Sequence, residues 1–352
     1  MIHSLLLFAL ALDAPFEFLF APSTAENKRN SEADFLVLKD GRVMLAWTEF
    51  YTGQGSDWGA ARLSAKFSKD GGKTWDGKIT LQENIGQMNV MEPDLLRLKS
   101  GKILFAFCRK NNEADAAPML RVSTDDAKTF SPPVAIPIDP SPSYTGMNND
   151  RMIQLKSGRV VLPLWYTKDY RVDRHILTRA YYSDDEGKTW TPSRTIVDIP
   201  DSKAGAQEPG VVELKDGRIM MWIRTDKGKI HRCYSNNGGE TWSVPMAMQL
   251  DSPLSPQAIK RIPKTGDLLL VWNNSPKLRT PLTAAISKDD GKTWERIKNL
   301  DATPDHTFAY TSIQFLKDRA LFSYYFGSPP GSRAADGWSL KLKAVPLHWF
   351  YE

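Results

Sequence analysis

The sequence predicts an all-β protein, a six-bladed β-propeller whose blades are four-stranded antiparallel sheets. A box of the pattern Ser-x-Asp-x-Gly-x-Thr-Trp recurs along the chain, and a motif of two apolar runs around a tight turn recurs between the boxes. Successive boxes begin 52 to 60 residues apart. One box and one turn motif give two hairpins, and therefore four strands, per unit, which is the size of a propeller blade. We expect very little helix.

The boxes are interpreted as structural turns. They begin at Ser68, Ser123, Ser183, Ser235 and Ser287. An Asp and a Gly in a turn also resemble a calcium loop, but an Asp side chain can accept N–H groups of its own turn, and the Trp can pack between strands. Asn237 replaces the Asp in one box, and Ala127 and Phe130 replace the Gly and Trp in another. A turn tolerates these exchanges better than a ligand set does, so we predict no metal and no other cofactor.

Six turn motifs set the number of blades. The turns lie at Gly41, Gly101, Gly158, Gly217, Gly266 and Asp318-Arg319. Asp-Gly and Ser-Gly between β-rich runs are typical of tight hairpins. The last unit has no box, and we expect a strand near Phe16 to Phe20 to complete it, because a closed ring leaves only short sheet edges.

Composition narrows the classes of function. The chain has 352 residues, of which 41% are hydrophobic and 25% charged, as in globular proteins. Its 46 basic and 41 acidic residues are interspersed, which makes nucleic acid an improbable partner. Cys108 and Cys233 cannot form a disulfide framework and lie in no metal-binding motif. No apolar stretch has the length of a membrane span.

The domain organisation is predicted to be simple. Residues 15–352 form a single propeller domain, and residues 1–14 are either a signal peptide or the lead into the N-terminal strand. The run SLLLFALA ends in small residues, as before a cleavage site, although no Lys or Arg precedes it. We therefore expect a secreted or periplasmic protein, and otherwise a cytoplasmic one. The oligomeric state stays open.

Polar residues recur at one position of the inner strands. Nine residues before each turn stand Glu32, Glu92, Asn149, Glu208, Gln257 and Tyr310. Polar side chains at six equivalent places in otherwise apolar strands indicate a polar cavity around the propeller axis. A water-filled channel is the alternative. The topology puts this cavity at the rim opposite the boxes.

Three arginines of different units reach the same rim. Arg29, Arg224 and Arg279 would repel one another unless they held an anion, most simply a carboxylate. The returning strands bring Glu49, Arg109 and the Asn273-Asn274 pair to this rim, and the loop beyond the first of them brings Asp57.

Four segments resemble the bacterial exo-sialidase (neuraminidase) family, whose members are six-bladed propellers with these boxes. The likeness covers nearly the whole chain. The segments are KRNSEADFLVLKDGRVMLAWTE (28–49), QEPGVVELKDGRIMMWIR (207–224), SPKLRTPLTAAISKDDGKTW (275–294) and FAYTSIQFL (308–316).

The resemblance implies a glycoside hydrolase that releases terminal sialic acid, or a related carboxylated nonulosonic acid, from glycoconjugates with retention. It assigns the nucleophile to Tyr310, its partner to Glu208 and the acid/base to Asp57. The three arginines would hold the substrate carboxylate, and Glu49 would support Arg29. We expect the substrate-binding set to be Arg29, Arg224, Arg279, Glu32, Glu49, Glu92, Asn149, Arg151 and Gln257.

A tyrosine nucleophile suits a sugar whose anomeric carbon carries a carboxylate, because a carboxylate nucleophile would be repelled there. A phenol with a pKa near 10 needs a base, so Tyr310 and Glu208 should be in contact. The chain departs from the family at Glu32 and Asp34, where an apolar or neutral residue is common, and in the cluster Asn148 to Arg151. Two alternatives follow: a hydrolase of another acidic sugar, and a non-catalytic carbohydrate-binding propeller.

Overall fold

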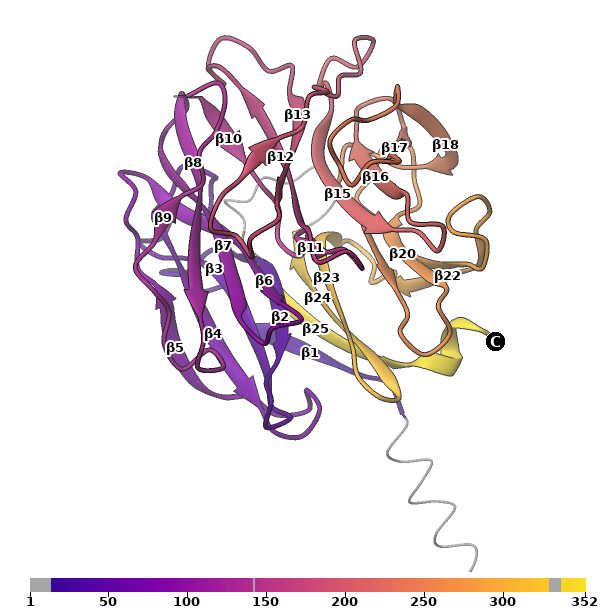
Figure 1. Ribbon diagram of the computed structural model, residues 1–352. Coiled ribbons are helices and arrows are strands. Elements are labelled where there is room, and N and C mark those ends of the chain that lie inside the picture. Colours follow the sequence, from indigo (N-terminus) through magenta and orange to yellow (C-terminus); the bar gives the residue numbers. More distant parts are fainter. Residues whose placement is uncertain (1–13, 142, 329–336) are drawn as a thin grey trace, which may run out of the picture.

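The computed structural model is built of β-strands arranged around a centre (Figure 1). It describes residues 14–141, 143–328 and 337–352, so residues 1–13 of the expected signal segment lie outside the described residues. The described part of the chain has one 3-10 helix, Leu347–Phe350, and no helix with the length and apolar character needed to cross a membrane. The predicted all-β class is confirmed.

The strands follow the repeats of the sequence. The first unit consists of β2 (Asn30–Val37), β3 (Val43–Phe50), β4 (Ala61–Ser68) and β5 (Asp76–Gln82). The second consists of β6 (Asn89–Arg97), β7 (Ile103–Asn112), β8 (Asp115–Ser123) and β9 (Val134–Ala135). The third consists of β10 (Tyr144–Gly146), β11 (Ile153–Gln154), β12 (Val160–Thr167), β13 (Leu177–Ser183) and β14 (Thr191–Pro192).

The second half of the chain repeats the pattern. The fourth unit consists of β15 (Gln207–Glu213), β16 (Ile219–Arg224), β17 (Lys229–Ser235) and β18 (Met246–Asp251). The fifth consists of β19 (Ala258–Arg261), β20 (Leu268–Asn273), β21 (Leu282–Ser287) and β22 (Glu295–Asp301). The sixth consists of β23 (Thr307–Phe315), β24 (Arg319–Gly327) and β25 (Trp338–Pro346), together with β1 (Phe16–Ala21) from the N-terminus. These units are consistent with the six predicted blades.

The N-terminal strand completes the last sheet, as the sequence predicts. Strand β1 pairs antiparallel with β25, with Phe16 opposite Ala344 and Phe18 opposite Leu342, and the sheet order is β1-β25-β24-β23. The first and last thirds of the chain therefore share one sheet, and the ring is closed by backbone hydrogen bonds.

Two neighbouring units are not separate sheets. In the described residues the second and third units form one nine-stranded sheet, because β10 pairs with β12 and also bridges to β8 through Tyr144 and Ala116. Four-stranded sheets were expected throughout. The extra strand lies in the 60-residue interval between the second and third boxes, which is the longest of the intervals.

The box side chains make hydrogen bonds within their own turns. In the first box, Asp70 Oδ1 accepts the backbone N–H of Thr74 at 2.9 Å, Ser68 Oγ accepts that of Gly72 at 2.8 Å, and Trp75 Nε1 donates to the Gly72 carbonyl at 2.8 Å. The box with Asn237 keeps the same pattern, because an amide oxygen can accept in place of a carboxylate oxygen. The boxes are thus turn-stabilising elements.

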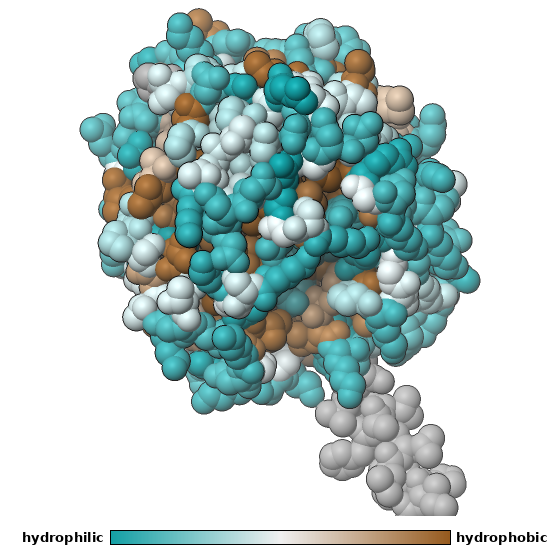
Figure 2. Space-filling model, in the orientation of Figure 1, coloured by the Kyte–Doolittle hydropathy of each residue, from teal (hydrophilic) through white to brown (hydrophobic). Residues whose placement is uncertain are grey.

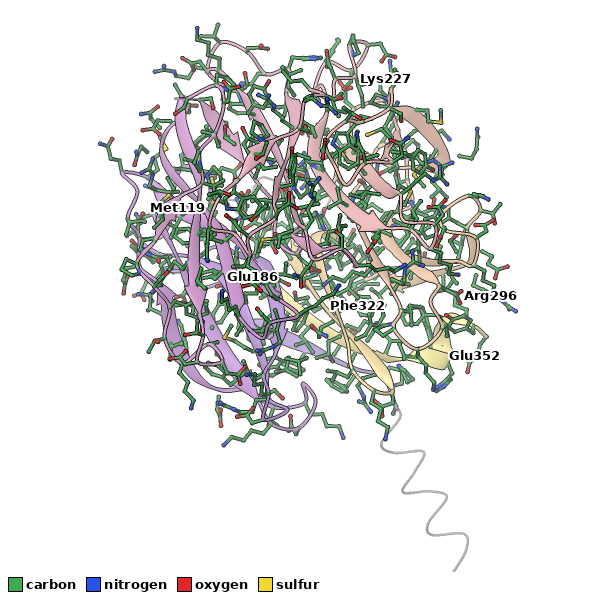
Figure 3. All side chains as sticks on the ribbon, in the orientation of Figure 1. Met119, Glu186, Lys227, Arg296, Phe322 and Glu352 are labelled. Carbon is green, nitrogen blue, oxygen red and sulfur yellow. The ribbon has the colours of Figure 1, made fainter. Side chains whose placement is uncertain are left out.

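The core lies within and between the sheets. Phe322 is fully buried, whereas Lys227, Arg296 and Glu352 lie at the periphery (Figure 3). The outer surface is largely hydrophilic, with scattered apolar residues (Figure 2). A tryptophan on a second strand packs closely against a glycine of a first strand: Trp222 lies opposite Gly210, and a Cβ on Gly210 would come within 2.0 Å of its ring.

This close approach predicts the effect of one added methyl group. Gly210→Ala should destabilise the protein by about 1 to 3 kcal/mol, because the Trp222 ring must shift in a packed core. Urea unfolding measures the change. Trp222→Phe in the same chain should recover part of the loss, since the smaller ring leaves room for the methyl group. Equal stability of Gly210→Ala and the parent protein would contradict this packing.

Candidate active site

Four of the six predicted ring residues are aimed at the axis by β-bulges. Glu32, Glu92, Glu208 and Tyr310 lie at register shifts near the starts of β2, β6, β15 and β23, with φ values of 39°, 65°, 41° and 58°. A left-handed backbone is unfavourable for residues other than glycine and is found mostly where it serves function. The bulge turns each side chain out of the strand's alternation and into a common space.

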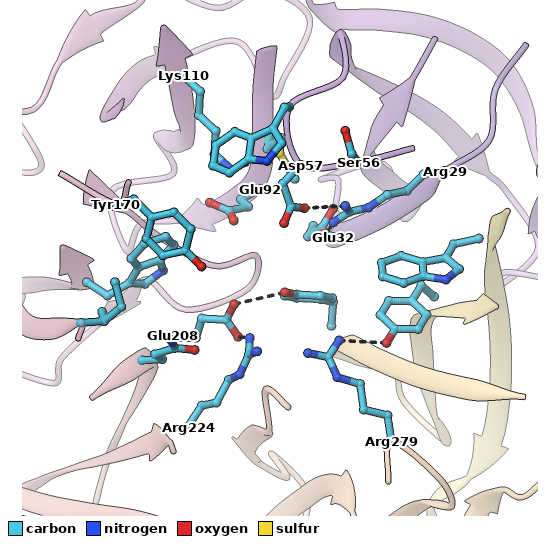
Figure 4. Close-up of a pocket in the computed structure, with 18 of the residues that line it drawn as sticks. Arg29, Glu32, Ser56, Asp57, Glu92, Lys110, Tyr170, Glu208, Arg224 and Arg279 are labelled. Carbon is cyan, nitrogen blue, oxygen red and sulfur yellow. Dashed lines mark hydrogen bonds and ion pairs between the residues drawn. The ribbon is translucent and has the colours of Figure 1, made fainter. Parts of the chain in front are cut away.

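That space is a cavity of about 640 Å³ at the centre of the ring (Figure 4). Its wall contains the acidic residues Glu32, Asp57, Glu92 and Glu208. It also contains the cations Arg29, Lys110, Arg224, Lys277 and Arg279. Aromatic residues also line the wall, among them Trp58, Tyr144, Tyr170, Tyr310, Tyr325 and Trp338. The cavity is therefore rich in both charged groups and aromatic rings.

Tyr310 and Glu208 are in contact, as the sequence analysis expects. The Tyr310 hydroxyl donates a hydrogen bond to Glu208 Oε1 at 3.1 Å, and Glu208 Oε2 forms an ion pair with Arg224 (Figure 4). Burial and the negative charge of Glu208 raise the pKa of Tyr310 well above its ordinary value, against the opposing charge of Arg224. In the free protein Tyr310 is thus a neutral phenol whose proton already points at a carboxylate.

Arg29 is held by two carboxylates. Its guanidinium donates to Glu32 and, at 2.5 Å, to Asp57 Oδ1, while its Nε donates to Ser31 Oγ at 2.7 Å. Burial would lower the pKa of Arg29, but the charges of Glu32 and Asp57 outweigh it and raise the pKa. The support that the resemblance assigned to Glu49 therefore comes from Glu32.

Asp57 lies on the loop after β3, and its side chain is 57% exposed toward the cavity. Enclosure by the cavity wall would raise the pKa of Asp57, but the charge of Arg29 outweighs this and lowers it to about 2. Asp57 is consequently ionised in the free protein.

Arg279 completes the trio of arginines. It donates to the Tyr325 hydroxyl at 2.9 Å and to the Leu254 carbonyl at 3.0 Å, and it has no carboxylate partner among the described residues. Arg29, Arg224 and Arg279 all line the same cavity, so ring closure brings together guanidinium groups that are up to 250 residues apart in sequence.

Four predicted substrate-binding residues do not line the cavity. Glu49 lies on the other side of its strand, where it accepts hydrogen bonds from Arg62 at 2.8 Å and Ser64 at 2.7 Å and pairs with Lys78. The sequence analysis expected Glu49 to support Arg29, and this expectation is wrong, because the Glu49 carboxylate contacts Arg62, Ser64 and Lys78 instead. Side chains alternate along a strand, and the count of residues to the rim does not fix the face.

Asn149, Arg151 and Gln257 are buried near the axis, where they join the third unit to the first, fifth and sixth units. Asn149 Nδ2 donates to the Ala33 carbonyl at 2.7 Å and the Tyr310 carbonyl at 3.2 Å, and Arg151 donates to the Gln257 carbonyl at 2.7 Å. The backbones of Asn149 and Gln257 are not left-handed, unlike those of the four ring residues that line the cavity. Asn149 therefore supports the backbone of Tyr310 from below.

Aspartates below the cavity also connect the units. Asp34 Oδ2 accepts the N–H of Leu95 at 2.6 Å, Asp94 Oδ2 accepts that of Met152 at 2.8 Å, and Asp150 Oδ2 accepts that of Ile313 at 2.9 Å. Asp34, one of the departures from the family pattern, thus has a structural contact. In the described residues no group of His, Cys, Asp and Glu side chains is arranged to hold a metal ion.

Several cavity residues were missed by the sequence analysis. Lys110 lines the cavity, whereas its neighbour Arg109, which the sequence analysis brought to this rim, pairs at 3.4 Å with Asp115 outside it. Trp58, Tyr144 and Tyr170 form an aromatic wall with ring centroids 5.1 to 6.2 Å apart. A lysine at the end of the apolar run ILFAFCRK was a usable signal for Lys110, but strand alternation had to be known to choose it over Arg109.

Comparisons with known proteins agree with this architecture. The family model for BNR repeat-like domains matches residues 87–322. A sialidase of Bacteroides fragilis is 26% identical over 223 residues, which are 60% of this chain and 39% of that protein. An anhydrosialidase of Macrobdella decora is 32% identical over 94 residues, 26% of this chain and 11% of that protein. The aligned part of this chain thus spans well under half of either relative.

Solved structures share the fold. The sialidase of Trypanosoma rangeli superposes with a TM-score of 0.74 at 15% identity, covering 96% of this chain and 60% of its own. A Dyadobacter fermentans protein of unknown function superposes with a TM-score of 0.74 at 21% identity, covering 94% and 98%. The T. rangeli enzyme has also been solved with 2,3-difluorosialic acid as a covalent intermediate, with a TM-score of 0.73 at 16% identity and coverage of 94% and 59%.

The raised pKa of Glu92 predicts that the free energy of unfolding of the protein depends on pH. Burial raises the pKa of Glu92 from 4.5 to about 8, with Lys110 opposing and Glu32 adding to the shift. The folded state then binds this proton more tightly than the unfolded state, so the contribution of Glu92 to stability falls as pH rises from about 4.5 to 8. Glu92→Gln should therefore gain stability relative to the parent protein between pH 5 and pH 8.

Urea unfolding of both proteins at the two pH values measures this gain. Glu83→Gln, the same change at an exposed glutamate nearby, is the control and should show no such trend. A Glu92→Gln difference that is constant with pH, or that shrinks as pH rises, would refute the assignment.

Proposed function

Because the chain belongs to the family of BNR repeat-like domains, we propose that it is a sialidase-like glycoside hydrolase. Its substrate would be a glycan that ends in sialic acid or a related carboxylated nonulosonic acid. The observation that carries the proposal is the contact of Tyr310 with Glu208, itself paired with Arg224, in a cavity that also holds Arg29 and Arg279.

The arginines suit a carboxylate on the substrate. Arg279 has neutral partners only among the described residues, and the Nε of Arg224 is buried without a partner. A carboxylate placed between them would gain charge-assisted hydrogen bonds, which are about twice as strong as neutral ones. Arg29 would contribute the third positive group.

Tyr310 would act as nucleophile with Glu208 as its base. As the Tyr310 oxygen bonds to the anomeric carbon, its proton passes to Glu208 Oε1, and the bond from the anomeric carbon to the leaving oxygen breaks. A neutral phenol avoids the repulsion that the substrate carboxylate would exert on a carboxylate nucleophile. The 3.1 Å hydrogen bond supports this proton transfer, because the acceptor is already in place.

Asp57 would supply the proton for the leaving oxygen. Its pKa of about 2 in the free protein results from Arg29. When a substrate carboxylate approaches Arg29, it adds a negative charge and competes for the guanidinium, and both effects raise the pKa of Asp57. Substrate binding would thus prepare the acid.

The second half of the reaction reverses these roles. A water molecule attacks the anomeric carbon and gives its proton to Asp57. The bond from the anomeric carbon to Tyr310 breaks, and Glu208 returns the proton to the phenol. Two displacements at one carbon give overall retention.

Glu32 favours a second candidate, the same reaction on another acidic sugar. It neutralises part of the Arg29 charge inside the cavity and is itself fully buried, so it reshapes the place where the carboxylate would lie. Aryl glycosides of several acidic sugars, assayed side by side, distinguish the two candidates by their relative kcat/KM.

Loss of one hydroxyl group tests the proposed role of Tyr310. Tyr310→Phe should lower the turnover of a fluorogenic sialoside by about 10³-fold or more, because the nucleophile is removed while the ring still fills its place. Tyr234→Phe is the matched control, since Tyr234 lies on β17 outside the cavity, and it should keep the parent rate. Turnover by Tyr310→Phe at the parent rate would remove Tyr310 from the mechanism.

A further inference from the structure

The turns between the first and second strands of the six units carry the positive charge of the chain. Each turn begins with a lysine. These turns, residues 39–42, 99–102, 156–159, 215–218, 264–267 and 317–319, hold eleven basic and four acidic residues. Their net charge of +7 exceeds the net charge of +5 of the whole chain, so the remainder of the protein is slightly negative.

The six turns lie on the face of the protein opposite the cavity. The cavity residue Glu32 stands near the start of β2, and the first turn follows the other end of this strand. The boxes share this face, because Lys39 N–H donates to Asp126 in the box of the second unit, and Lys215 N–H donates to Asp290 in the box of the fifth. The turns join inner strands and the boxes join outer ones, so the turns surround the axis and the boxes lie outside them.

Neighbouring turns contact one another. Lys39 Nζ would lie 3.6 Å from a Cβ on the glycine of the second turn, and Lys99 Nζ donates to the Lys156 carbonyl of the third turn at 2.7 Å. Lys215 Cε would lie 3.8 Å from a Cβ on the glycine of the fifth turn. The leading lysines are therefore successive members of one ring around the axis. We call it the lysine ring; its members are Lys39, Lys99, Lys156, Lys215, Lys264 and Lys317.

The lysine ring is exposed and has no acidic partners. All six residues are exposed, and none forms an ion pair within the part of the chain that the structure describes. The ammonium groups of Lys99 and Lys215 reach backbone carbonyls only. The second basic residue of four of these turns is paired, by contrast: Arg42 with Asp40, Lys102 with Glu186, Arg159 with Asp184 and Arg218 with Asp216, at 2.6 to 2.8 Å.

The acidic residues of the boxes do not cancel this charge. The five boxes hold nine acidic and six basic residues, fewer in excess than the turns have cations. Their carboxylates already have partners: Asp70 accepts the N–H of Thr74 in its own turn, and Asp290 pairs with Arg261 at 2.9 Å. The face as a whole is therefore positive, and the cations without acidic partners are nearest the axis.

The form of the lysine ring selects its partner. The six turns contain no aromatic residue that could stack on a sugar or a base. Lysine is a compact point charge, suited to general attraction rather than to the bidentate recognition that arginine provides. A linear polyanion would cross the ring and contact a few lysines at a time, whereas a charged plane contacts all six. The surface of an anionic bilayer is such a plane.

We propose that the lysine ring binds the protein peripherally to a bilayer of anionic phospholipids, with the cavity facing away from the lipid. Each lysine near such a surface raises the partition coefficient about fivefold, and the attraction falls off within a Debye length of about 10 Å at 0.1 M salt. This attachment goes beyond the proposed hydrolysis and does not depend on it. It leaves the mouth of the cavity open to the solvent.

Vesicle sedimentation of the full chain tests the attachment. The vesicles contain phosphatidylcholine alone or with about 30% phosphatidylglycerol, and the readout is the ratio of the two partition coefficients. This ratio removes any contribution of the apolar N-terminal run, residues 4–11. The combined variant Lys39→Gln, Lys156→Gln and Lys264→Gln, which changes alternate units, should lower the ratio about 100-fold. Raising the salt from about 0.1 M to 0.5 M should have a similar effect on the parent protein.

Two further variants separate position from net charge. Lys168→Gln, Lys203→Gln and Lys227→Gln together remove the same charge from exposed lysines on loops at the cavity side, and this variant should keep the parent ratio. Lys39→Arg, Lys156→Arg and Lys264→Arg together keep the charge of the ring and should also bind like the parent protein.

Four outcomes overturn the proposal. An equal loss in both glutamine variants would make binding a matter of net charge. A ratio near one for the parent protein, or a ratio that does not change with salt, would exclude electrostatic attachment to lipid. Ring-dependent binding to heparin in solution, without binding to the anionic vesicles, would make the partner a polysaccharide.

Discussion

Closure of the ring is the constraint on which the rest of the molecule depends. The hydrogen bond from Tyr310 to Glu208 joins the sixth unit to the fourth across the axis, at a sequence separation of 102 residues. This hydrogen bond can form only if the sheets of the fourth, fifth and sixth units keep their relative positions in the ring. The pairing of β1 with β25 fixes the last sheet with the first residues of the domain, and Asn149 and Asp150 tie the Tyr310 strand to the third unit from beneath.

Four residues with an unfavourable left-handed backbone meet at the axis. The left-handed residues Glu32, Glu92, Glu208 and Tyr310 all face one cavity, while the box turns have their side-chain hydrogen bonds satisfied internally. The charged groups that line the cavity differ in whether they have partners. Arg29 is paired with two carboxylates, whereas Lys110 and Glu92 form no ion pair in the described residues.

Repeats made the fold predictable, and strand alternation limited the prediction of the site. The six turns, the boxes and the N-terminal strand followed from periodicity alone, because each unit has the same turn chemistry. Glu208, Tyr310 and the three arginines were placed by counting along strands and by resemblance. Counting failed at Asn149 and Gln257, where no left-handed bulge turns the side chain into the cavity, and at Glu49, which lies on the other face. Bulges depend on register between strands, which a single sequence does not display. Lys110 was missed for the same reason.

The central claim is that Tyr310 forms a bond to the anomeric carbon, and its most direct test is to trap that bond. The protein is incubated with 2,3-difluorosialic acid, whose fluorine atoms slow the breakdown of a glycosyl-enzyme, and is then digested for mass spectrometry. The account predicts a sugar adduct on the peptide containing Tyr310. An adduct on Asp57, Glu208 or another carboxylate, or no adduct with an enzyme that turns over sialosides, would contradict it.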